Sequence, residues 1–212
     1  MSSAHAAAHD DKPRLHHHFE SYDQQRDSAT LGMWFFIAQE ILFFGGIFMA
    51  YIVYRIANPI AFAAASHELD IRLGGFNTVV LIASSLTMAL GVRAAQLGDR
   101  KKLVTFLLLT ILLGLTFLGV KVVEYSAKYE HHLIPGVHWD WQGTTFRDLP
   151  YSPNGARQFY GLYFGMTGLH ALHMIIGIGI LCWMVVMARR GHWSPDNYNF
   201  VEGVGLYWHF VD

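Results

Sequence analysis

The chain has 212 residues, of which 53% are hydrophobic and only 15% are charged, and its formal net charge is −1. Because about a quarter of the residues in soluble domains are charged, this composition predicts a protein with several membrane spans. A net charge near zero argues against a nucleic-acid partner. The single cysteine, Cys182, lies in an apolar segment, and one cysteine excludes a disulfide framework within the chain.

Residues 1–29 show no hydrophobic periodicity and are rich in histidine. This composition predicts a disordered cytoplasmic tail, and a metal-binding tract is an alternative that the histidine spacing does not specify. The tail has no apolar signal region, and it is too acidic and too poor in arginine for a mitochondrial transit peptide. Residues 30–212 are then expected to form one transmembrane helical domain.

Four long apolar segments, at residues 31–54, 76–95, 103–123 and 159–188, are predicted to be membrane-spanning helices. At about 1.5 Å per residue, each can cross a hydrocarbon core of roughly 30 Å. A fifth apolar stretch begins near Val204 and ends at Asp212, and nine residues cannot cross a bilayer. We therefore expect an all-α, polytopic transmembrane helix bundle of five spans, with the last span truncated in this sequence.

Small and polar residues recur on one face of several predicted spans, which suits close helix–helix contact. In the second span this face holds Asn77, Ser84, Thr87 and Gly91, and in the third it holds Thr110, Gly114, Phe117, Lys121 and Glu124. Lys121 and Glu124 are one turn apart, so we expect them to form an ion pair. In the fourth span Gly161 and Gly165 form a G-x-x-x-G pattern.

Four ionisable residues fall within the apolar segments: Glu40, His170, His173 and His209. Polar groups at membrane depth need partners, so we predict that these four form an intramembrane polar core or a lipid-linked set. For Glu40 the alternative is proton transfer. Residues of secondary interest are Lys121, Glu124, Glu202 and Asp212.

Two arguments predict that none of these residues holds a metal. His170 and His173 point about 60° apart around a helix, so they cannot both be axial ligands of one haem iron. Glu40 and the two histidines offer suitable ligand atoms, but no spacing in the sequence compels a metal site.

Basic residues are denser on one side of the predicted membrane topology, which favours a cytoplasmic N-terminus. On that side lie Lys12, Arg14, Arg26, Arg93, Arg100, Lys101, Lys102, Arg189 and Arg190. The segment 125–158 is predicted to be an outer loop. Its aromatic residues Trp139, Trp141 and Tyr151 suggest a folded extramembrane cap or a docking surface.

Several motifs, in the same order along the chain, resemble subunit III of haem–copper cytochrome c oxidases. Two of them are Thr167-Gly-Leu-His170-Ala-Leu-His173, continuing to residue 177, and the stretch 202–212 that ends in Tyr207-Trp208-His209-Phe210-Val211-Asp212; the others are residues 36–44, 77–85, 98–101 and 124–125. The resemblance covers about residues 31–212. The first two helices of the seven-helix form have no counterpart here, so the resemblance also implies five spans, as in shorter bacterial versions.

The resemblance implies a non-catalytic subunit of a proton-pumping terminal oxidase that reduces oxygen to water. Haem and copper would lie in partner subunits, and this chain would bind phospholipid but no metal or other cofactor. The expected partners are the catalytic subunit I, the other oxidase subunits, phospholipids and a larger respiratory supercomplex. The expected role is to support proton uptake and stability during turnover, in the inner membrane of a bacterium.

Alternatives within the class are subunit III of a quinol oxidase and an accessory protein of a nitric oxide reductase. From other classes, a proton-coupled transporter would use Glu40 and the histidines as a proton relay, and a membrane cytochrome would bind haem itself.

Overall fold

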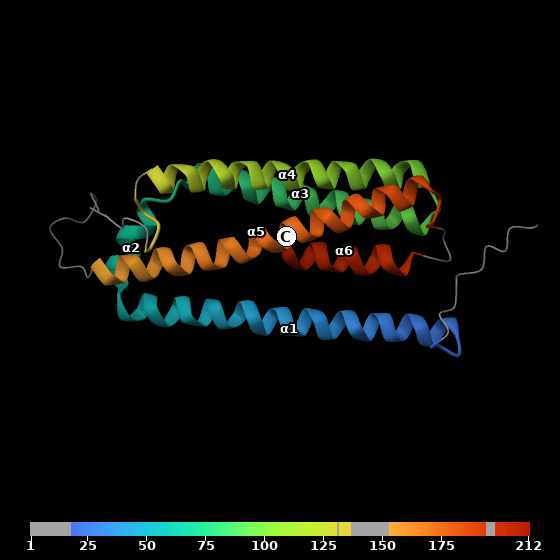
Figure 1. Ribbon diagram of the computed structural model, residues 1–212, viewed down its shortest axis with the longest axis horizontal. Coiled ribbons are helices and arrows are strands. Elements are labelled where there is room, and N and C mark those ends of the chain that lie inside the picture. Colours follow the sequence, from blue (N-terminus) through green and yellow to red (C-terminus); the bar gives the residue numbers. More distant parts are fainter. Residues whose placement is uncertain (1–17, 131, 137–152, 194–197) are drawn as a thin grey trace, which may run out of the picture.

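In the parts that the computed structural model describes, residues 18–130, 132–136, 153–193 and 198–212, the chain forms six α-helices (Figure 1). They are α1 (Tyr22–Ala57), α2 (Pro59–His67), α3 (Ile71–Gln96), α4 (Arg100–Glu130), α5 (Pro153–Arg189) and α6 (Asn199–Val211). Four of them, α1, α3, α4 and α5, are long and apolar enough to cross a membrane. The predicted all-α bundle is therefore confirmed, with four candidate spans and a shorter α6 of 13 residues.

The helices extend beyond the boundaries that hydropathy predicts. Helix α1 begins at Tyr22, inside the segment interpreted as a tail, because the Ser21 hydroxyl accepts a hydrogen bond from the Gln24 N–H at 3.2 Å. Residues 1–17 lie outside the described residues. Both ends of the predicted outer loop 125–158 are also helical, since α4 runs to Glu130 and α5 begins at Pro153. Its residues Trp139, Trp141 and Tyr151 lie outside the described residues as well.

The short helix α2 was missed by the sequence analysis because its nine residues are too few for a span. It begins with Pro59 at the first helical position, where the missing N–H costs no hydrogen bond. It packs against the start of α5, where a Cβ on Gly155 would lie only 2.8 Å from the Ala61 Cβ. Asp70 then starts α3 by accepting hydrogen bonds from the N–H groups of Arg72 and Leu73. Helix α2 thus covers one end of the bundle.

At the opposite end of the bundle, Asp99 starts α4. Its Oδ1 accepts a hydrogen bond from the Lys102 N–H at 3.1 Å, and its Oδ2 lies 2.9 Å from Lys102 Nζ. The bond from the Lys102 backbone holds the pKa of Asp99 below its ordinary value. The carboxylate therefore stays charged at neutral pH, and its contribution to the helix start is lost only as the pH falls through the lowered pKa.

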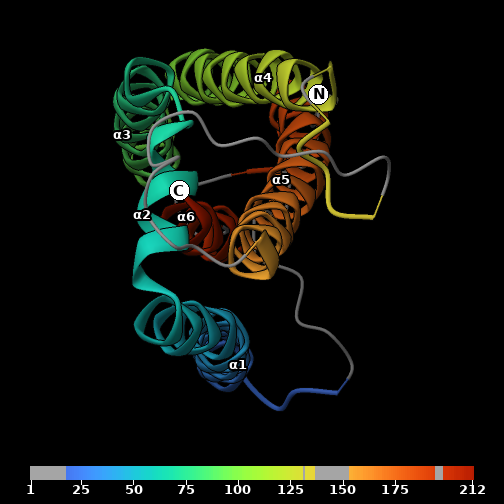
Figure 2. The same cartoon turned by 90° about the vertical axis from the view of Figure 1, so that its left-hand side faces the viewer.

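Helices α3, α4 and α5 stand side by side, and α6 packs against α3 and α5 (Figure 2). Helix α1 stands apart from this group and contacts α2, α5 and α6 but not α3 or α4. The structure describes all 36 residues of α1, and among them Glu40 alone is buried. One long span is therefore attached to the bundle by few contacts.

The polar face predicted on α3 is confirmed as a buried helix–helix contact. Asn77, Ser84, Thr87 and Gly91 are all buried, and the hydroxyl oxygens of Thr87 and Thr110 lie 2.8 Å apart between α3 and α4. Small side chains here let the two backbones approach closely, and the paired hydroxyls satisfy each other away from water.

The G-x-x-x-G pattern of α5 does not make such a contact. A Cβ on Gly161 or Gly165 would meet nothing within 4 Å, so in this structure neither glycine lies against another helix. The close approach lies further along α5, where a Cβ on Gly177 would be 2.9 Å from the Trp208 ring. The Trp208 side chain is fully buried, and its indole N–H donates to the Ser84 hydroxyl at 2.9 Å.

Adding one methyl group at Gly177 tests this contact. We expect Gly177→Ala to destabilise the α5–α6 packing by about 1–3 kcal/mol, because the buried indole cannot move away. Gly179→Ala is the matched control, since its Cβ would meet no atom within 4 Å. The measurement is the thermal midpoint of the purified protein in detergent, followed by size-exclusion chromatography. Equal midpoints for the two variants would refute the close contact.

Candidate functional site: polar contacts at membrane depth

A carboxyl–imidazole pair lies at the middle of the bundle. Glu40 Oε2 on α1 is 3.3 Å from His173 Nε2 on α5, and both side chains are largely buried. His173 Nδ1 lies 2.8 Å from the Leu169 carbonyl oxygen, which can only accept, so Nδ1 carries a proton. The contact between Nε2 and Oε2 therefore requires one shared proton, as an imidazolium and a carboxylate or as a neutral pair.

Aromatic side chains surround this Glu40–His173 pair. The Phe44 ring lies 5.3 Å from the imidazole, and the Phe36 ring lies 5.8 Å from the ring of Tyr207 on α6. The Tyr207 hydroxyl donates a hydrogen bond to the His173 carbonyl oxygen at 2.9 Å. Three helices thus meet here, and the rings cover a polar contact at a depth where an unpaired polar group is costly.

The structure does not bring all four predicted polar-core residues together. His170 turns away from the Glu40–His173 pair and packs edge-on against Phe117 of α4, with ring centres 5.1 Å apart. His209 on α6 lies elsewhere, with Nδ1 2.7 Å from the Ser85 hydroxyl of α3. The four residues therefore occupy three separate places, because residues three apart on a helix point in different directions.

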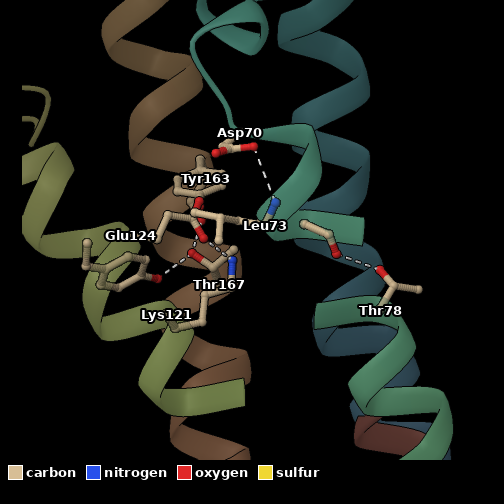
Figure 3. A network of polar contacts seen from close by, with 9 residues as sticks. Asp70, Leu73, Thr78, Lys121, Glu124, Tyr163 and Thr167 are labelled. Atoms are coloured by element: carbon tan, nitrogen blue, oxygen red, sulfur yellow. Dashed lines mark hydrogen bonds and ion pairs between the residues drawn. The ribbon is translucent and has the colours of Figure 1, made fainter. Parts of the chain in front are cut away.

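A second polar cluster links α4 and α5 nearer the α2 end of the bundle (Figure 3). The predicted ion pair is confirmed, with Lys121 Nζ 2.8 Å from Glu124 Oε2. The Tyr163 hydroxyl of α5 donates to the other Glu124 oxygen. Thr167 donates to the Tyr163 carbonyl oxygen and therefore accepts from the Tyr125 hydroxyl, 2.5 Å away. Glu124 is thus held by a cation and a phenol from two different helices.

The sequence analysis missed two members of this cluster. Lys128 was counted as a loop charge, yet it is only 5% exposed, and its ammonium group lies 5.5 Å from the centre of the Tyr163 ring and 5.9 Å from that of Tyr160. These contacts have the geometry of cation–π interactions. The spacing of Lys121, Glu124 and Lys128 at three and four residues gave the signal, because it places all three on one face of α4.

The remaining secondary residues lie on α6. Glu202 is exposed in its first turn, whereas the Asp212 carboxylate oxygens are buried beside Trp208 and Ser84. Among the residues that the structure describes, no three or more His, Cys, Asp or Glu side chains converge in a way that would hold a metal ion.

The sequence matches the family described as "Cytochrome c oxidase subunit III" over residues 16–134 and 141–212. The chain belongs to this family. It is therefore subunit III of a haem–copper oxidase, of the cytochrome c or the quinol type. Subunits III of this family bind no metal and are not the catalytic chain of the complex.

Bacterial relatives support this assignment. Cytochrome c oxidase subunit 3 of Corynebacterium diphtheriae is 32% identical, over 87% of this chain and 82% of the relative. Cytochrome c oxidase subunit 3 of a Synechocystis strain is 30% identical, over 88% of this chain and 71% of the relative. Quinol oxidase subunit 3 of Bacillus spizizenii is 27% identical, over 86% of this chain and 79% of the relative.

Removing the Tyr163 hydroxyl tests the cluster around Glu124. We expect Tyr163→Phe to destabilise the protein by about 1 kcal/mol, because a partly buried carboxylate loses a charge-assisted hydrogen bond. The control is Tyr129→Phe on the same end of α4, where the side chain is 62% exposed. Thermal midpoints in detergent measure the effect, and a Tyr163 variant as stable as the Tyr129 variant would contradict it.

Proposed function

We propose that this chain is the non-catalytic subunit III of a proton-pumping cytochrome c oxidase in a bacterial respiratory chain. It packs on the catalytic subunit I, binds phospholipid, and supports proton uptake and the stability of the complex during turnover. Haem and copper lie in partner subunits. Other oxidase subunits and a larger respiratory supercomplex are further partners.

The observation that carries this proposal is that polar side chains at membrane depth bind one another between helices. Glu40 and His173 join α1 to α5, and the Trp208 indole joins α6 to Ser84 of α3. His209 and Ser85 form a further contact between α6 and α3. Such contacts fix helices relative to each other, which suits a scaffold beside a redox centre held by another chain.

The arrangement of basic residues supports a cytoplasmic N-terminus. The start of α1, the turn between α3 and α4, and the end of α5 lie at the same end of the bundle (Figure 1). Basic residues described near that end are Arg26, Arg93, Arg100, Lys101, Lys102, Arg189 and Arg190, against Arg55, Arg72, Lys128 and Arg157 at the α2 end. Because basic residues concentrate on the cytoplasmic side, we place the N-terminus there and the chain in the bacterial inner membrane.

The electron donor is proposed to be cytochrome c. A quinol is the second candidate, since one of the relatives is a quinol oxidase subunit. Oxygen consumption by the purified complex with reduced cytochrome c, and then with a quinol, separates the two donors.

Purification of the chain from its own membranes tests the proposal directly. An affinity-tagged chain extracted in mild detergent is expected to bring a catalytic subunit with a haem a absorption spectrum and bound phospholipid. A chain that leaves the membrane alone would overturn the proposal and would favour a transporter.

Substitutions at Glu40 separate a scaffold role from a catalytic one. We expect Glu40→Gln to keep initial oxidase activity within about twofold of the wild type, because this chain holds no redox centre. A glutamine N–H can still donate to His173 Nε2, whereas Glu40→Leu leaves that nitrogen unpaired. We therefore expect activity to decline during turnover faster for Glu40→Leu than for Glu40→Gln. Immediate loss of activity in a fully assembled Glu40→Gln complex would contradict the proposal.

A further inference from the structure

Helix α1 carries a seven-residue repeat on the side turned away from the other helices. One row of this outer seam is Gly32, Gln39, Gly46 and Val53, and the other is Phe35, Leu42, Met49 and Ile56. All eight residues are exposed, and Leu42 is 77% exposed. Figure 2 shows no other helix on the far side of α1. A seven-residue repeat keeps one seam facing a neighbouring helix along a left-handed crossing.

Gln39 lies on this seam at the middle of the membrane. Its neighbour Glu40 contacts His173, which is 14 residues from Phe159 and 15 from Ala188, the ends of the apolar run in α5. The headgroup regions are therefore about 15 Å away on either side, beyond the reach of a glutamine side chain. No hydrogen bond joins the Gln39 amide to any described residue. Lipid tails cannot bind its two N–H donors or its carbonyl oxygen.

Two glycines make room for a helix beside Gln39. Gly32 and Gly46 lie seven residues before and after it, and a Cβ on either would meet nothing within 4 Å. Small residues on a transmembrane seam let a second backbone come close, and a central amide can then form an interhelical hydrogen bond. The seam therefore offers the shape and the hydrogen-bonding groups for a helix that has a polar side chain at the same depth.

We propose that the outer seam of α1 binds a transmembrane helix of another subunit of the oxidase, with a polar side chain facing Gln39. This inference rests on the proposed function, since it requires the chain to be one subunit of a larger membrane complex. A lipid would satisfy the apolar row of the seam but not the amide. A second copy of this chain would set Gln39 against Gln39, and the test distinguishes that outcome.

Cross-linking in the assembled oxidase identifies the neighbour. In a Cys182→Ala background, Gly46→Cys places a thiol on the seam and the matched control Gly45→Cys places one beside it, at another open glycine. A photoactivatable maleimide attached to each thiol marks whatever lies next to it, and mass spectrometry of the purified complex identifies the adduct. We expect an adduct with another oxidase subunit, at about five times the yield of the Gly45 control.

A second substitution tests the hydrogen bond. Gln39→Leu keeps the bulk of the side chain and removes its polar atoms, so we expect the Gly46 adduct to fall about threefold, the factor that corresponds to a typical interhelical hydrogen bond in a membrane. An unchanged yield overturns the role of Gln39. Lipid adducts alone, or equal yields at the two glycines, overturn the proposed partner, and an adduct between two copies of this chain does the same. Failure of the haem-bearing subunit to co-purify would instead refute the proposed function.

Discussion

Water is absent from the hydrocarbon core, so each polar side chain in a span must find its partner in protein, and this constraint shapes the bundle. Glu40 is the clearest case, because it is the one buried residue of α1 and it contacts an imidazole on another helix. Without that contact, α1 would meet the bundle mainly through aromatic rings. The place of an entire span therefore depends on one carboxyl group at mid-depth.

The same constraint explains why Trp208 lies at the centre of the packing. Its indole N–H reaches Ser84, while its ring occupies the space that Gly114 and Gly177 leave open. A side chain on either glycine would exclude the ring, and a smaller residue at 208 would leave a void between α4, α5 and α6. The sequence motif around Trp208 therefore couples a hydrogen bond to a shape that three helices define together.

Hydropathy and residue spacing predicted the four spans, the buried polar face of α3 and the Lys121–Glu124 pair, because each depends on neighbours within one helix. They missed α2 and the early start of α1, where Pro59 and Ser21 fix helix ends by local hydrogen bonding. They could not divide His170 from His173, nor add Tyr163 to Glu124. Those contacts depend on how separate helices are rotated, which no single segment specifies.

The two polar regions also differ in what they ask of the rest of the chain. Glu124 is held by Lys121 on its own helix, so the α4–α5 cluster keeps an ion pair even when Tyr163 is absent. The Glu40–His173 pair has no such local partner, because its two groups come from helices that meet only in the folded bundle. A loss of packing should therefore release α1 first, while α3, α4 and α5 remain joined. This difference makes α1 the span whose position depends most on what covers its other side.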